Sequence, residues 1–254
     1  MKLTILGSGT SQGVPIIGCN CEVCSSPDPK DQRLRSAAYI ETEDAHICID
    51  IGPDFRQQML RAQKTKCDAI LITHEHADHV AGMDEIRPFN FMTQKPVDIF
   101  AEERVCKELK TRFAYIFSEN PYPGAPRANL HPLGPDDVFY VNQTKVQCIR
   151  VQHGGLPILG FRIENTAYLT DVKEIPESEM QKLRDLEILV ISALRKEPHY
   201  SHLSLDDALA YIKKIQPEKA LITHISHQMG LHDEVQATLP DGVFMAYDGM
   251  MLTV

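Results

Sequence analysis

The sequence predicts a mixed α/β fold built as one domain, and three observations support this prediction. Short apolar segments typical of strands alternate with helical segments along all 254 residues. No Pro/Gly/Ser-rich linker or charge run divides the chain, so we expect a single domain over residues 1–254. Three apolar strands end in Thr and a potential metal ligand, LITH at 71–74 and 221–224 and YLTD at 168–171, which suggests two related halves meeting at a shared site.

In the N-terminal half, strands are expected where aliphatic residues run between polar turns. Pro53 opens the first helix, because proline is tolerated in a first helical turn. Residues 118–136 hold five Pro and two Gly, so we expect a loop there, with a lid as one interpretation. The expected strands are 2–6, 37–41, 46–50, 68–73 and 97–101, and the expected helical stretches are 53–63, one starting near 80, and 102–113.

In the C-terminal half, Ser204 with Asp207 three residues later predicts the capped start of a helix that runs to about residue 215. Asp248-Gly249 predicts a hairpin turn between two short final strands. Residues 7–13 (GSGTSQG) match neither the dinucleotide-binding nor the phosphate-loop pattern, so we expect a tight turn. The other expected strands are 138–141, 146–152, 159–163, 167–170, 187–191 and 219–223.

Composition and charge narrow the function classes. The formal net charge of −9 provides no bulk basic surface for nucleic acid, so we expect no stable nucleic-acid complex. No run of 18 apolar residues could cross a membrane, and the short apolar N-terminus is broken at Gly7, unlike a signal peptide. Seven unevenly spaced Cys argue against a disulfide framework. We therefore expect a cytoplasmic protein without a membrane partner.

Residues 74–79 (HEHADH) place four potential metal ligands in six positions directly after an apolar strand. His74 and His76 project to the same side of an extended chain, whereas the adjacent Asp78 and His79 can serve a second ion. Imidazole and carboxylate groups suit Zn, Fe or Mn. One tetrahedral ion needs only three or four ligands, so this cluster with distant partners favours two metals. The alternative is a polar loop that is rich in His.

The pattern His74-x-His76-x-Asp78-His79 resembles the signature of the metallo-β-lactamase superfamily, and the resemblance runs along essentially the whole chain. It implies a four-layer αββα sandwich with the metals at one edge of the two sheets. β-Lactamases usually place a Cys in the second site, whereas an Asp is the pattern of the superfamily's phosphodiesterases and glyoxalase-type hydrolases. The resemblance implies His153 as the third ligand of the first metal, His224 as the third residue of the second site, and Asp171 as the bridge between the ions.

A second cluster, Cys19-x-Cys21-x-x-Cys24, lies in a Gly/Pro-flanked loop at about residues 18–25. Three thiols this close can bind one Zn²⁺, and three free thiols are the alternative. The chain resembles most the phosphonate-pathway (PhnP-like) branch, which hydrolyses cyclic ribose phosphates and shares this loop and the THISH sequence at 223–227. That resemblance implies His227 as the fourth ligand of a structural zinc.

These residues lead us to expect a metal-dependent phosphodiesterase for cyclic nucleotides or cyclic ribose phosphates. Two divalent ions can hold a bridging hydroxide and neutralise phosphate charge. The resemblance implies that His202 contacts phosphate and acts as general acid. Turnover should also depend on Asp78, through the metal it holds. We expect two catalytic ions, Mn or Zn with Fe as a third option, one structural Zn, a small phosphodiester as substrate and, from the resemblance, a homodimer.

Three other functions compete with this expectation. The same two-metal arrangement could hydrolyse a thioester or lactone, because the nucleophile can attack a carbonyl. The segment 202–224 also resembles tRNA 3′-end-processing nucleases, although the net charge of −9 speaks against a phosphate track. The third is a non-catalytic zinc protein, since quinone-cofactor biosynthesis relatives carry a similar Cys loop with a degraded metal motif.

His199 precedes His202 in the same segment, and for it we expect a solvated loop position.

Overall fold

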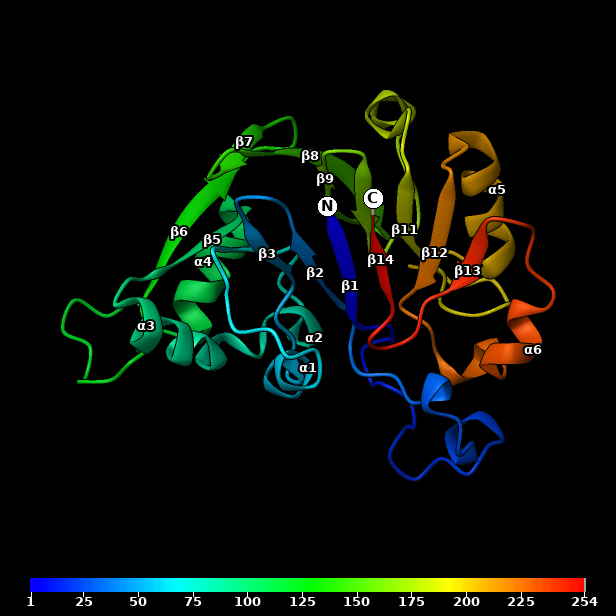
Figure 1. The fold of residues 1–254 in the computed structure, drawn as a ribbon, viewed down its shortest axis with the longest axis horizontal. Coiled ribbons are helices and arrows are strands. Elements are labelled where there is room, and N and C mark those ends of the chain that lie inside the picture. Colours follow the sequence, from blue (N-terminus) through cyan, green and yellow to red (C-terminus); the bar gives the residue numbers. More distant parts are fainter. Residues whose placement is uncertain (254) are drawn as a thin grey trace.

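The computed structural model describes residues 1–253, whose strands form two sheets of seven strands packed face to face (Figure 1). The first sheet has the order β14-β1-β2-β3-β4-β5-β6, and β3 to β6 run parallel. Its strands are β1 Lys2–Gly7, β2 Ala37–Glu41, β3 His46–Ile49, β4 Ala69–Leu71, β5 Val97–Glu102, β6 Ala128–Leu133 and β14 Met251–Thr253. Its helical segments are α1 Phe55–Arg61, α2 Ala77–Val80, η3 Met83–Ile86, α3 Arg87–Thr93 and α4 Glu103–Arg112. Two short helical turns, η1 Val23–Ser25 and η2 Pro29–Asp31, lie outside the sheets in the segment between β1 and β2 (Figure 1).

The second sheet has the order β13-β12-β11-β10-β9-β8-β7, and β10 to β13 run parallel. Its strands are β7 Val138–Val141, β8 Thr144–His153, β9 Leu156–Ile163, β10 Thr166–Leu169, β11 Ile188–Ser192, β12 Lys219–Thr223 and β13 Val243–Met245. Its helical segments are η4 Glu177–Leu183, α5 Leu205–Ile215, η5 His227–Met229 and α6 His232–Gln236.

Helices cover the outer face of each sheet, so the fold is the αββα sandwich that the resemblance implied (Figure 1). The layers explain why the central strands are apolar on both faces. In β11, Ile188 and Val190 pack between the sheets, whereas Leu189 and Ile191 pack outward with residues of α5. Because both sets are buried, this strand is a continuous apolar run.

The structure differs from three expectations. The loop expected over 118–136 contains β6, which pairs in parallel with β5 and tolerates Pro132 because it is the edge strand. The turn at Asp248-Gly249 does not form a hairpin. It joins β13 in one sheet to β14 in the other, and the Asp248 carboxylate accepts hydrogen bonds from the main-chain and side-chain groups of Ser8 at 2.8 Å each. The helical stretch near residue 80 is divided into α2, η3 and α3.

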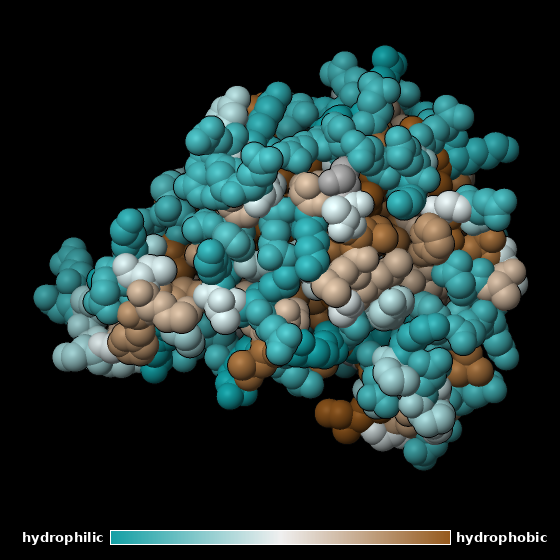
Figure 2. All heavy atoms as spheres, in the orientation of Figure 1, coloured by the Kyte–Doolittle hydropathy of each residue, from teal (hydrophilic) through white to brown (hydrophobic). Residues whose placement is uncertain are grey.

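Other local expectations are confirmed. Ser204 and Asp207 form the predicted capping box at the start of α5. The predicted turn follows β1, and Gly13 closes it by donating its main-chain N–H to the carbonyl oxygen of Thr10 at 2.8 Å. Gly7 ends β1, and a β-carbon there would lie 1.9 Å from the carbonyl oxygen of Arg35. Within the described residues, no helix is long and apolar enough to cross a membrane. Figure 2 shows a largely hydrophilic face, with apolar side chains gathered near its centre around the edge strands β14 and β13.

Candidate metal centre

The first cluster of the candidate site joins residues from both sheets. His74 and His76 lie in the loop between β4 and α2, and His153 ends β8. With Asp171, their potential ligand atoms all lie within 4.8 Å of one another. The Nε2 atoms of His74 and His153 lie 3.8 and 3.9 Å from Asp171 Oδ2. The sequence-predicted three histidines of the first site are therefore brought together here.

The second cluster lies on the other side of Asp171. Asp78 and His79 belong to α2, and His224 directly follows β12. Asp171 Oδ1 lies 3.1 Å from His224 Nε2 and 3.5 Å from His79 Nε2. Asp78 Oδ2 lies 3.1 Å from His79 Nε2. The carboxylate of Asp171 thus directs one oxygen to each cluster, which is the arrangement of a bridging ligand.

Outer partners orient the imidazoles. Asp50, fully buried at the end of β3, lies with Oδ2 2.7 Å from His79 Nδ1. Thr73 donates its main-chain N–H to Asp50 Oδ1 at 2.9 Å. His153 Nδ1 lies 2.9 Å from the carbonyl oxygen of Ser201 and therefore carries the proton. In both histidines the outer partner lies at Nδ1 and Nε2 faces the cluster, the arrangement that metal-binding histidines use.

Three of these strand-end residues have left-handed backbones. Asp50 has φ of 61°, Asp171 of 57° and His224 of 56°. This conformation disfavours residues with a β-carbon by about 1 kcal/mol and persists only where the surrounding structure imposes it. It turns the chain sharply at the end of each strand, so that the side chain faces the shared edge of the two sheets.

Burial and neighbouring charges shift the protonation of the site. Burial lowers the pKa of His74 well below its ordinary value, so that imidazole is neutral at pH 7. Burial opposes protonation of His79 as well, but the carboxylates of Asp171, Asp50 and Asp78 raise its pKa well above the ordinary value. Burial would raise the pKa of Asp171, but the surrounding His224, His79 and His74 hold it well below its usual range.

His202 lies against both clusters. Its ring stacks on His224 at 4.9 Å and tilts against His153 at 4.6 Å between centroids. Burial first, and the neighbouring His224, lower its pKa to about 3. His199 lies in a loop and is partly exposed, as expected, and its ring lies 5.2 Å from that of His202 at the rim of the site.

The cysteine cluster is separate from these two. The Sγ atoms of Cys19 and Cys21 lie 3.3 Å, and that of Cys24 3.5 Å, from Nδ1 of His227 in η5. A tetrahedral zinc with Zn–S near 2.3 Å and Zn–N near 2.0 Å would separate S and N by about 3.6 Å. The four side chains therefore fit a zinc ion with little movement.

The histidine and aspartate clusters also fit divalent ions. Within residues 1–253, the buried Nε2 atoms of His79 and His224 have no hydrogen-bond partner, although carboxylate oxygens lie close by. Each cluster offers nitrogen and carboxylate donors, the set preferred by Zn, Mn and Fe. Two ions sharing Asp171 would use these otherwise orphaned nitrogens.

Sequence reasoning missed Asp50 as an outer partner of the site. A signal was present: an acidic residue directly follows the apolar run Ile47-Cys48-Ile49. A buried carboxylate at a strand end needs a partner, which would have marked it for attention. The main-chain carbonyl of Ser201, which accepts from His153, could not be predicted in this way, because every residue has a main-chain carbonyl.

Comparison with known proteins agrees with this fold. A family model described as a beta-lactamase superfamily domain matches residues 45–225. A crystal structure described as a new diphosphatase from the PhnP family is 40% identical, with a TM-score of 0.92, and the match covers 99% of this chain and 96% of that one. The chain therefore belongs to the metallo-β-lactamase superfamily and, within it, to the PhnP family.

Two further proteins are similar to this chain, one in sequence and one in fold. An octanoyltransferase from Porphyromonas gingivalis is 40% identical over 252 residues, which are 98% of this chain but 51% of that protein, so this chain spans about half its length. The zinc-bound PqqB of Methylobacterium extorquens is 18% identical with a TM-score of 0.81 over the whole of both chains, and shows the shared fold. The chain thus has the fold of a metal-dependent hydrolase, with clusters of candidate metal ligands.

Proposed function

We propose that this protein is a metal-dependent phosphodiesterase for small diesters such as cyclic nucleotides or cyclic ribose phosphates. The observation that carries the proposal is the position of Asp171 between two clusters, with His202 packed on a histidine of each. The description of the PhnP-family relative as a diphosphatase supports chemistry at phosphorus.

The proposed centre assigns a role to each side chain. His74, His76 and His153 would hold one ion, Asp78, His79 and His224 the other, and Asp171 both. Two bound Mn or Zn ions, with Fe as a third option, would lower the pKa of water toward neutrality and neutralise phosphate charge. Cys19, Cys21, Cys24 and His227 would hold a structural zinc.

His202 would serve the leaving oxygen. Its imidazole is neutral in the free protein because burial lowers its pKa to about 3. The negative charge of a bound phosphate would raise that pKa again, because an adjacent anion favours the protonated ring. His202 can then hold a proton on a ring nitrogen and transfer it to the oxygen that leaves phosphorus.

A metal-defined activity screen tests the proposal. Protein reconstituted with Mn²⁺ or Zn²⁺ should hydrolyse bis(p-nitrophenyl) phosphate and a cyclic nucleotide. His202→Ala should lower kcat about 10²–10⁴-fold, the usual contribution of a general acid, while retaining its metals. The absence of diester turnover with Mn²⁺ would refute the phosphodiesterase, and full activity in His202→Ala would refute only the role of that residue.

One observation favours a second candidate, hydrolysis of a thioester. The name of the octanoyltransferase relative points to acyl chemistry, and this chain spans about half of that protein. The same clusters could serve attack on a carbonyl carbon. A panel of acyl thioesters that includes an octanoyl thioester, measured beside the diesters, separates the two candidates by kcat/KM.

We further propose that residues 1–254 act as one domain in the cytoplasm and pair as a homodimer. Size-exclusion chromatography with light scattering tests the dimer, for which the measured molar mass should be twice that of one chain.

A further inference from the structure

A ladder of alternating charges runs behind the first cluster. Arg112 donates from Nη1 to the main-chain oxygen of Glu75 at 2.7 Å, and the Glu75 carboxylate pairs with Arg104. Arg104 Nη2 lies 3.3 Å from Glu102 Oε2, and Arg150 Nη2 donates to Glu102 Oε1 at 2.6 Å. We refer to these five residues as the charge ladder. It connects the ligand loop, α4 and β5 of the first sheet with β8 of the second.

Arg104 is the member that touches the ligand loop of the first sheet and also β9, the strand paired with the one that ends in His153. On one side it pairs with Glu75, the residue between His74 and His76. On the other side its Nη2 donates to the carbonyl oxygen of Pro157 at 2.9 Å. Pro157 lies opposite Gln152 in the β8–β9 pairing, one step from His153. One guanidinium therefore links the loop that carries His74 and His76 to the strand that pairs with the His153 strand.

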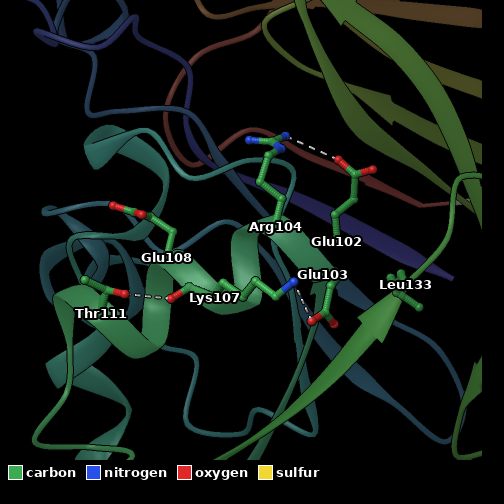
Figure 3. Close-up of a pocket in the computed structure, with 7 residues that line it drawn as sticks. All are labelled: Glu102, Glu103, Arg104, Lys107, Glu108, Thr111 and Leu133. Atoms are coloured by element: carbon green, nitrogen blue, oxygen red, sulfur yellow. Dashed lines mark hydrogen bonds and ion pairs between the residues drawn. The ribbon is translucent and has the colours of Figure 1, made fainter.

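The two carboxylates of the ladder are shielded, although the Arg104 side chain between them is 37% exposed. The side chains of Glu102 and Glu75 are 12% and 18% exposed, whereas that of Lys107, on the same helix as Arg104, is 73% exposed. Figure 3 shows Arg104 directed toward Glu102, while Lys107 lies along the helix toward Glu103, its partner at 3.3 Å. The hollow of about 600 Å³ beside them is lined by charges that pair with one another, so we assign it no ligand.

The geometry of the first cluster needs such a link. Its nitrogens come from two different sheets, and metal–nitrogen distances near 2.0–2.1 Å tolerate only small errors in position. The planar guanidinium can bond several acceptors in fixed directions, which a lysine cannot. Removing it would leave the shielded carboxylate of Glu75 without its partner, so the loop would move to rehydrate that charge.

We propose that Arg104 is a positioning residue that fixes the His74–His76 loop relative to His153 and so sets the affinity of the first cluster for its ion. The inference rests on the proposed two-ion centre. The second cluster has a different outer partner, Asp50 on His79, and should not depend on Arg104.

Chelator-competition titrations of the intact protein with Mn²⁺ or Zn²⁺ test this inference. We expect Arg104→Gln to bind one of the two catalytic ions about 10–100-fold more weakly, the usual effect of losing an outer partner. The other ion and the structural zinc should stay bound as in the wild type. Arg104→Lys should recover only part of the affinity, and kcat should return toward the wild-type value at saturating metal.

Two comparisons make the test specific. Glu75→Gln should cause a similar loss, and the double variant should lose no more than the larger single loss, because both changes remove one interaction. Lys107→Gln removes a cation from the same helix and should bind metal like the wild type.

The outcomes against the inference are distinct. Wild-type affinity in Arg104→Gln, or equal weakening of both ions, would overturn the positioning role while leaving the proposed function intact. If Arg104→Gln fails to fold, as judged by circular dichroism and zinc content, an unchanged affinity in Glu75→Gln would overturn it. A wild-type protein that binds only one ion outside the cysteine cluster would refute the two-ion centre itself.

Discussion

The histidine–aspartate clusters and the cysteine cluster bring their side chains together in different ways. The first two collect residues from the ends of strands in both sheets, and His74, His79, Asp171 and His224 are almost fully buried. The cysteine cluster takes three of its four residues from one loop outside the sheets, and Cys21 is exposed. The core fixes the former, whereas the latter depends much more on the ion it would hold.

Local chemistry reflects this difference. At the cysteine cluster, a hydrogen bond from the main-chain N–H of Cys24 is the main cause that lowers the pKa of Cys21 to about 6, so a thiolate forms easily in an exposed loop. At the buried clusters, burial keeps His74 neutral, neighbouring carboxylates favour the charged form of His79, and neighbouring histidines favour the ionised form of Asp171. We therefore expect ligand loss to damage chemistry at the buried clusters and stability at the cysteine cluster.

The largest expected effect is the loss of activity in Asp78→Ala. The variant should lose one catalytic ion and, with it, several kcal/mol of transition-state stabilisation, roughly a thousandfold in kcat/KM. Its melting temperature should stay close to that of the wild type, because the sheets fix this region without the ion. Metal analysis checks the loss of the ion, and calorimetry checks the melting temperature. A large fall in the melting temperature beside the fall in activity would contradict the comparison.

Cys21→Ser should show the opposite pattern. Loss of the structural zinc should lower the melting temperature by about 5–10 °C, because structural zinc contributes directly to folding. Activity at 25 °C should remain within a few-fold of the wild type. Ser25→Ala, in the same loop, serves as the control and should keep both its zinc and its stability. An unchanged zinc content in Cys21→Ser would refute the structural site.

The smallest effect concerns the support behind the cysteine loop. His232 donates its main-chain N–H to Asp31 at 2.8 Å and lies 3.2 Å from Arg33 Nη2 through Nδ1. Burial first, then the charge of Arg33, lower its pKa to about 4. Between pH 6.5 and pH 4, His232 therefore binds a proton in the unfolded chain but not in the folded one. The contribution of neutral His232 to the free energy of unfolding is complete above pH 6.5 and is lost as the pH falls toward 4.

Thermal unfolding of wild type and His232→Gln from pH 7.5 to pH 4.5 measures this contribution. The wild type should be more stable at pH 7.5, and the difference should narrow by about 3 °C for each kcal/mol lost as the pH falls. A difference that stays constant over this range would show that His232 is not the group responsible.

The sequence predicted well what depends on neighbours along the chain. The expected strands 37–41 and 138–141 coincide with β2 and β7, because apolar alternation between polar turns is a local signal. Residues 74–79 indicated a candidate metal motif for the same reason, and the structure brings these side chains into two candidate ligand clusters. The strand β6 was missed because Pro132 argues against a strand unless its edge position is known. Asp248 was misinterpreted because its partner, Ser8, lies at the other end of the chain.

The supporting residues of the site could not be predicted for a related reason. Asp50 is 29 residues from His79, and Arg104 is 53 residues from Pro157. Neither separation has a periodicity or a motif. The Asp50 contact arises when β3 and β4 pair within the first sheet, and the Arg104 contact arises when the two sheets pack. The roles we assign to the predicted ligands remain proposals that the metal titrations will test.

The left-handed backbones of Asp50, Asp171 and His224 have an evolutionary consequence. At each of these positions, a residue with the required side chain must adopt a strained backbone conformation. The chemistry of the site and the stability of the fold therefore favour different residues at the same three positions. A duplicated copy of this gene that no longer needed catalysis could gain stability by replacing them with glycine or asparagine. We would expect decay of the enzyme to begin at these positions.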